Sequence, residues 1–254
     1  MKILISPAKK MREDVDSLPY EDLPAFLPKT EEILKTLQAM SYESLKSLWK
    51  CSDAIARQNV QRLEQMDLRH HLTPALLAYE GIQYRYMAPG VFSEQALAYV
   101  QQHLRILSGF YGILRPFDGV VPYRLEMQTK LALGTAPDLY AYWGEDLVKS
   151  LLAESSCMVN LASKEYSLAV SKYLPKSVPM ITCVFAQERD GKRIEKGTLC
   201  KMARGEMVRF LAENQIDTPE EMCHFTGLGF HFDKEHSQEN TFVFLTESAD
   251  RNQR

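Results

Sequence analysis

The strongest candidate for a phosphate-binding element is a glycine turn within the sequence LRILSGFYGILRPFDGVVPYRLEM, residues 104–127. Gly109 and Gly112 flank Phe110-Tyr111 between two apolar stretches. Glycines so close together allow backbone N–H groups to converge in a concavity that fits an oxyanion. The spacing therefore predicts a tight turn at which a phosphate oxygen could be held.

Three arginines accompany this turn, namely Arg105, Arg115 and Arg124. Guanidinium groups match the geometry of phosphate oxygens. The block predicts a helix, a glycine turn and a second helix, which is similar to the helix-hairpin-helix elements that contact the DNA backbone. The alternative is a helix end followed by a structural turn, with Arg124 paired internally to Glu126 or Asp118.

Two other basic positions lie at the ends of predicted elements. Ser6 and Lys9 follow the first predicted strand, and their S-x-x-K spacing is too common to indicate a nucleophile and its base. Lys201 and Arg204 are neighbours on a predicted helix over residues 201–214. Each pair places positive charge near an element end, but a solvated helix start would explain Lys201 and Arg204 equally well.

A further candidate lies where a predicted strand leads into a predicted helix, at Asn160, Ser163, Lys164 and Glu165. Ligands bind at the carboxyl ends of strands in open α/β sheets, and a helix N-terminus favours anions. The simpler alternative is that Ser163 only caps the helix and that Glu165 complements the helix dipole.

Composition limits the classes of function. The 254 residues carry a net charge of −3, so contact with nucleic acid requires a local basic cluster. Five cysteines without a C-x-x-C pair indicate reduced thiols in a cytoplasmic protein. The sequence contains no apolar run of membrane-spanning length, no nucleotide-binding glycine motif and no histidine spacing typical of a metal site. We therefore expect no membrane association, no cofactor and no metal.

Hydrophobic patterns predict an α+β (mixed α/β) fold, with a central mixed sheet surrounded by helices and a helix-rich N-terminal half. We expect one domain over residues 1–254, with residues 248–254 forming a disordered tail. The predicted strands cover residues 2–6, 157–161, 178–188, 230–232 and 241–246, with a hairpin turn at Asp190-Gly191. The predicted helices start near Thr30, Ser52, Thr73, Ser93, Ser163 and Lys201, and those from Thr73 and Ser93 end at Gly81 and Gly109.

Several of these segments together resemble the YaaA family of bacterial peroxide-stress proteins. The matching pieces are residues 3–9, the block 104–127, Leu139-Tyr140 with Trp143-Gly144, residues 160–166 and residues 203–205. The resemblance implies a compact mixed α/β fold with a positively charged cleft, a DNA-binding helix-hairpin-helix element, and a role in limiting free intracellular iron during hydrogen peroxide stress. It also implies that the cleft is lined by Lys9, Arg105, Arg115, Arg124, Lys164, Lys201 and Arg204.

The sequence departs from the family pattern at three positions. Lys10, Gln83 and Met202 stand where Thr, Asp and a second Lys are common. The change at Met202 removes one positive charge from the basic segment, which bears on the strength of DNA binding more than on the fold.

Three hypotheses follow. The first is a cytoplasmic DNA-binding stress protein that contacts phosphates with little base readout. The second is an enzyme acting on a small phosphorylated or nucleobase-containing anionic ligand, with Tyr123, Glu126, Asn160 and Glu165 beside the basic groups. A closed pocket with a perturbed, buried glutamate would favour the enzyme, and a broad open groove would favour DNA. The third is iron sequestration, which the poor ligand spacing disfavours.

Overall fold

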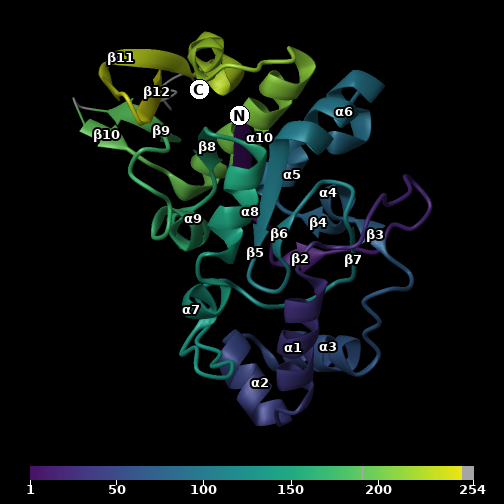
Figure 1. The fold of residues 1–254 in the computed structure, drawn as a ribbon. Helices are drawn as coiled ribbons and strands as arrows, with labels where there is room; N and C mark the ends of the chain where they lie inside the picture. Colours follow the sequence, from purple (N-terminus) through teal and green to yellow (C-terminus); the bar gives the residue numbers. More distant parts are fainter. Residues whose placement is uncertain (190–191, 248–254) are drawn as a thin grey trace, which may run out of the picture.

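A mixed sheet runs through the middle of the computed structural model, which describes residues 1–189 and 192–247 (Figure 1). Its strands are β1 (Lys2–Ile5), β5 (Leu104–Ser108), β6 (Gly112–Leu114), β8 (Met158–Leu161), β9 (Met180–Arg189), β10 (Lys192–Ile194), β11 (His231–Gln238) and β12 (Thr241–Glu247). Within the described chain they are ordered β11-β12-β9-β8-β1-β5-β6, with β10 paired to β9. The five strands from β12 to β5 are parallel, whereas β6, β10 and β11 pair antiparallel. The predicted mixed α/β fold with a central mixed sheet is confirmed.

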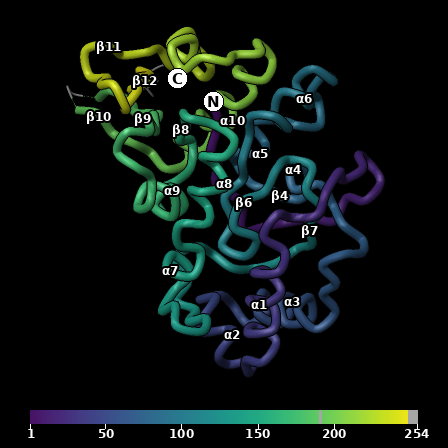
Figure 2. Tube along the Cα trace, viewed as in Figure 1, coloured from purple at the N-terminus to yellow at the C-terminus, as the bar shows by residue number. Residues whose placement is uncertain are grey.

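The first half of the chain is rich in helices, as predicted. The helices are α1 (Leu27–Gln38), α2 (Tyr42–Trp49), α3 (Asp53–Glu64), α4 (Ala75–Ala78), α5 (Ile82–Met87), α6 (Glu94–His103), α7 (Leu139–Trp143), α8 (Asp146–Glu154), α9 (Lys164–Ser171) and α10 (Gly197–Glu213). Short 3-10 turns cover Pro89–Val91, Pro219–His224 and Gly227–Gly229. Helices α1 to α3 form one end of the molecule, and the strands β9 to β12 lie at the opposite end (Figure 2).

The predicted helix–glycine turn–helix at residues 104–127 is wrong. Helix α6 ends at His103, and the following residues form the antiparallel hairpin β5–β6. All five β5 residues are buried, Arg105 and Ser108 included, as in a strand with both faces covered rather than in a helix that buries one face. Gly112 has φ +77°, the backbone conformation that a tight hairpin requires and that glycine adopts without strain.

Other predicted boundaries hold to within a few residues. Strands β1, β8, β9 and β12 fall where the apolar runs predicted them, and Ser93 caps α6 through a hydrogen bond from Ala96 N–H. Two small antiparallel pairs were not predicted: β2 (Lys10–Met11) with β4 (Tyr79–Glu80), and β3 (Thr73–Pro74) with β7 (Gly119–Val120). Gly81 precedes α5 rather than ending a helix. The predicted turn at 190–191 and tail at 248–254 lie outside the described residues.

Helices α5 and α10 pack against each other through Gly205. A Cβ at this position would overlap the Gln83 carbonyl oxygen and lie 2.9 Å from Met87 N. These are backbone atoms of α5, so they cannot move aside as a flexible side chain would. The close approach of the two helices therefore requires glycine here.

We predict that Gly205→Ala lowers the free energy of unfolding by about 2–3 kcal/mol, because the two helix backbones must separate. Chemical denaturation monitored by circular dichroism measures the change. Gly197→Ala on the same helix is the control, since nothing lies within 4 Å of its added Cβ, and it should change stability by less than about 0.5 kcal/mol. Equal effects of the two substitutions would contradict the packing argument.

Asp118 is a buried carboxyl group whose oxygen accepts a hydrogen bond from Arg115 N–H at 2.8 Å. Burial raises the pKa of Asp118 from 3.8 to about 7, because desolvation penalises the charged form. The folded protein therefore keeps a proton that the unfolded chain releases above pH 3.8. Stability must fall as pH rises through this window, since the folded state binds more protons.

We predict that Asp118→Asn reduces the loss of stability between about pH 5 and pH 8 by roughly 2–3 kcal/mol. Asparagine keeps an acceptor for the Arg115 N–H but does not titrate. Urea denaturation at both pH values measures the difference. Asp22→Asn is the control, because Asp22 is the more exposed partner of Arg115, and this variant should keep the wild-type pH dependence of stability. If Asp118→Asn also kept it, Asp118 would not be the carboxyl group that causes the pH dependence.

Candidate functional site

Two parallel strands deliver the first pair of candidate residues to the same sheet edge. Ser6 follows β1 and Ser163 follows β8, and the two strands pair in parallel. The Ser6 Oγ accepts a hydrogen bond from the Ser163 N–H at 2.8 Å, and the two hydroxyl oxygens lie 3.3 Å apart. Ser163 precedes α9, but its side chain makes no capping bond to that helix. The hydroxyl of Ser6, which contacts both the backbone N–H and the hydroxyl of Ser163, therefore ties the two strand ends together.

Helices α5 and α10 form the next wall of the site. The Tyr84 hydroxyl donates to the Ser6 carbonyl oxygen at 3.0 Å, which fixes α5 against the end of β1. The Gly205 contact then holds α10 against α5. Lys201 and Arg204 on α10 are thereby brought beside Gln83 on α5.

The opposite wall is the extended segment from Tyr123 to Met127. The Tyr123 hydroxyl lies 2.6 Å from the Ser108 Oγ and 2.9 Å from the Tyr79 hydroxyl, all of them buried. A Cβ on Gly109 would lie 2.8 Å from the Leu125 carbonyl oxygen. Because Gly109 lacks a Cβ, this segment can pack closely against the hairpin. This packing accounts for the glycine, and no bound phosphate is needed to explain it.

These walls enclose a cavity of ≈ 370 Å³, which we call the inner pocket. It brings together nine of the fifteen residues that the sequence indicated: Ser6, Lys9, Tyr123, Arg124, Glu126, Ser163, Glu165, Lys201 and Arg204. Sequence reasoning assigned no role in the site to Lys10, Glu80, Gln83 and Tyr84, which also line it. Its volume falls within the range typical of small-molecule sites.

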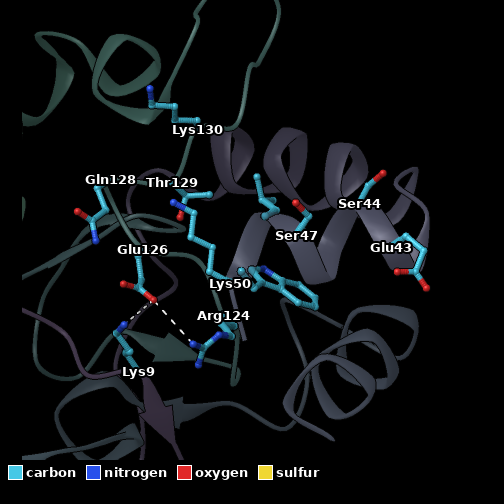
Figure 3. Close-up of a pocket in the computed structure, with 12 residues that line it drawn as sticks. Lys9, Glu43, Ser44, Ser47, Lys50, Arg124, Glu126, Gln128, Thr129 and Lys130 are labelled. Atoms are coloured by element: carbon cyan, nitrogen blue, oxygen red, sulfur yellow. Dashed lines mark ion pairs between the residues drawn. The ribbon is translucent and has the colours of Figure 1, made fainter. Parts of the chain in front are cut away.

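A second and larger cavity of ≈ 1040 Å³, the outer cleft, lies between α2 and the segment from Arg124 to Lys130 (Figure 3). Lys9, Arg124 and Glu126 line both cavities and so form their shared wall. Lys50, which ends α2, reaches into this cleft. Neither Lys50 nor Lys130 was a sequence candidate; helix α2, which Lys50 ends, was not predicted.

Glu126 balances the cations of the shared wall. Its carboxylate lies 2.9 Å from Lys9 Nζ and 3.8 Å from an Arg124 nitrogen, as the dashed lines in Figure 3 mark. Lys10 is likewise paired with Glu80 at 2.6 Å. Arg124 therefore makes the internal contact with Glu126 that the alternative interpretation of the sequence gave. Such pairs reduce the positive potential that an anion would meet.

Arg204 differs from these cations, since it forms no hydrogen bond or ion pair with any residue in ranges 1–189 and 192–247. Burial lowers the pKa of Arg204, and the fields of Cys200 and Glu195 offset this only in part. An arginine stays charged despite such a shift. The pocket therefore contains a largely desolvated positive charge.

Glu165 is the perturbed carboxyl group of the inner pocket. Partial burial raises the pKa of Glu165, and the charge of Glu126 adds to the effect. The Gln128 N–H, which donates to Glu165 at 3.2 Å, and the charge of Lys9 oppose it. A glutamate that retains its proton to higher pH is suited to acid–base chemistry or to donating a hydrogen bond.

Six sequence candidates lie outside both cavities. Arg105 is buried in an ion-paired cluster with Lys2 and Glu154, and Arg115 is half exposed, 3.9 Å from Asp22. Asn160 is buried and bonds Thr182 and the Ala162 N–H. The remaining three are Lys164, which is exposed, and Gly109 and Gly112, which belong to the hairpin.

The described residues contain neither a metal-binding cluster nor a membrane-spanning helix. Among residues 1–189 and 192–247, no three or more His, Cys, Asp or Glu side chains gather closely enough to hold a metal ion. Over the same residues, no helix has the length and apolar character needed to cross a membrane.

Fold and site together define a mixed α/β protein with a cationic pocket and cleft at the carboxyl ends of its parallel strands. Residues 1–236 match the family described as peroxide stress protein YaaA, and the chain belongs to that family. It is 52% identical over 244 residues to a UPF0246 protein of Agathobacter rectalis, covering 96% of this chain and 98% of the relative. The corresponding protein of Desulfitobacterium hafniense is 50% identical over 251 residues, covering 99% and 100%. The predicted resemblance is confirmed.

Proposed function

We propose that this protein acts in the response to hydrogen peroxide by binding DNA nonspecifically through the outer cleft. Membership of the peroxide stress family supports the physiological setting. The observation that supports DNA as the partner is the pair Lys50 and Lys130, which line an open cavity of ≈ 1040 Å³ and form no ion pair with any described residue. Cations of this kind neutralise phosphates without reading bases.

The outer cleft is suited to contacting the sugar–phosphate backbone of DNA. Helices α2 and α3 pack as a pair joined by a short turn, and Lys50 at this turn adopts a left-handed conformation with φ 46°. Of this pair, α2 and its end at Lys50 line the cleft, opposite Arg124 and Glu126. Because Lys9 and Arg124 already share Glu126, we expect binding of modest affinity that weakens steeply with salt.

The double variant Lys50→Ala/Lys130→Ala should reduce affinity for duplex DNA by about tenfold at low salt and lower the salt slope by about 2. Fluorescence anisotropy with labelled duplexes of two unrelated sequences, at about 50 and 200 mM salt, measures both quantities. The two sequences should behave alike.

Lys172→Ala/Lys176→Ala is the charge-matched control, since both lysines are exposed and lie beyond the pocket-facing start of α9. This control should retain wild-type affinity and salt dependence. A flat salt response of the wild-type protein, or equal losses in the two double variants, would remove the outer cleft as a DNA site.

We further propose that the protein limits free intracellular iron during peroxide stress. Cells lacking it should accumulate more free iron after hydrogen peroxide treatment, and the wild-type gene should restore the lower level. Whole-cell electron paramagnetic resonance of chelated ferric iron measures the pool. Unchanged iron in the deletion strain would refute this role; restoration by Lys50→Ala/Lys130→Ala would separate iron control from the outer cleft.

A second candidate function is favoured by the inner pocket. A concavity of small-molecule size that contains Glu165, a carboxyl group with a raised pKa, is a feature expected of an enzyme acting on a phosphorylated or nucleobase-containing small molecule. In that case Arg124 and Arg204 would anchor the substrate and Glu165 would move a proton.

A further inference from the structure

Three of the side chains that line the inner pocket each contain a buried nitrogen without a hydrogen-bond partner. The Nε atoms of Arg124 and Arg204 and the Nε2 of Gln83 form no hydrogen bond with any described residue, and all three side chains line the pocket. Gln83 is only 7% exposed. Buried polar groups in folded proteins almost always have partners, so three unmet donors in one cavity indicate a ligand rich in acceptors.

The net charge of the pocket indicates which chemical class of acceptor it binds. Its lining carries the five cations Lys9, Lys10, Arg124, Lys201 and Arg204 against the three carboxyl groups Glu80, Glu126 and Glu165, an excess of two positive charges when all are ionised. A phosphate monoester carries a charge of about −1.5 to −2 near neutral pH and offers three acceptor oxygens. A carboxylate has one negative charge and two oxygens, so the phosphate is the better match.

Volume and lining indicate that the ligand is more than inorganic phosphate. The cavity of ≈ 370 Å³ extends past the cations to Tyr84, Tyr123 and Tyr166. The hydroxyls of Tyr84 and Tyr123 are engaged with protein atoms, so these side chains contribute mainly ring edges to the lining. Such a lining accommodates a flat or apolar organic group beside the anchored anion.

We propose that the inner pocket binds a small phosphate monoester, with its phosphate oxygens accepting hydrogen bonds from Arg204, Arg124 and Gln83. The organic part lies against the tyrosines. Arg204 and Gln83 line the inner pocket and not the outer cleft, so this site does not depend on DNA binding. A free nucleotide and the 5′-phosphate of a DNA strand offer the same group.

Isothermal titration calorimetry with inorganic phosphate, adenosine monophosphate and adenosine tests the site. The monophosphate and phosphate should bind, and adenosine should bind far more weakly. Arg204→Gln should weaken binding of the monophosphate roughly 10- to 100-fold, and Gln83→Met about 3- to 10-fold. Arg209→Gln on the same helix, where Arg209 pairs with Glu213 and lines neither cavity, should bind as the wild type does.

Thermal unfolding establishes that each variant is folded. Gln83→Met keeps a side chain of similar volume and removes the amide that contains the unpartnered donor, so it remains informative if Arg204→Gln is unstable. Competition by 5′-phosphorylated and unphosphorylated single strands distinguishes a strand end from a free nucleotide. Lys50→Ala/Lys130→Ala should bind the monophosphate normally, which keeps this test independent of the DNA proposal. Absence of binding by the wild type, equal binding of adenosine, or unchanged affinity in both pocket variants would overturn the proposal.

Discussion

The parallel pairing of β1 with β8 is the constraint on which the site depends. Because the two strands run in the same direction, residues 6 and 163 leave the sheet at the same edge, where the hydrogen bond between Ser6 and the Ser163 N–H joins them. Ligand sites of open α/β sheets form at such carboxyl edges. Tyr84 then fixes α5 to Ser6, and α10 follows through the glycine contact. Residues almost 200 positions apart in sequence, such as Lys9 and Arg204, thereby line one cavity.

Glu126 decides how much of the positive charge at this edge is available. It lies within ion-pair distance of Lys9 and Arg124, which separate the outer cleft from the inner pocket. An anion that binds at this wall must share both cations with a resident carboxylate, and this weakens the attraction. Arg204 has no such partner among the described residues. The charge best placed to hold an anion is therefore within the pocket rather than at its mouth.

The sequence predicted the sheet better than the loops that approach it. Apolar runs located β1, β8, β9 and β12, because burial of a strand leaves a continuous pattern. The hairpin β5–β6 was predicted as helical, since Leu104 and Leu107 also continue the stripe of α6 and only tertiary pairing with β1 decides between the two. Arg105 and Arg115 were grouped with Arg124 on sequence proximity, which cannot reveal that Glu154 and Asp22 are their neighbours. Lys50 carried no local signal, and Gln83 stood out only as a departure from the family pattern.

Among the hydroxyl and carboxyl groups of the pocket, Glu165 is the one that a bound anion would affect most. The hydroxyls of Tyr84 and Tyr123 are already hydrogen bonded to protein atoms. Glu165 has a raised pKa, and an anion bound nearby would raise it further, since like charges disfavour ionisation. Binding of a phosphate would thus draw a proton onto Glu165. In the proposed site, anion binding and protonation of Glu165 would therefore favour each other.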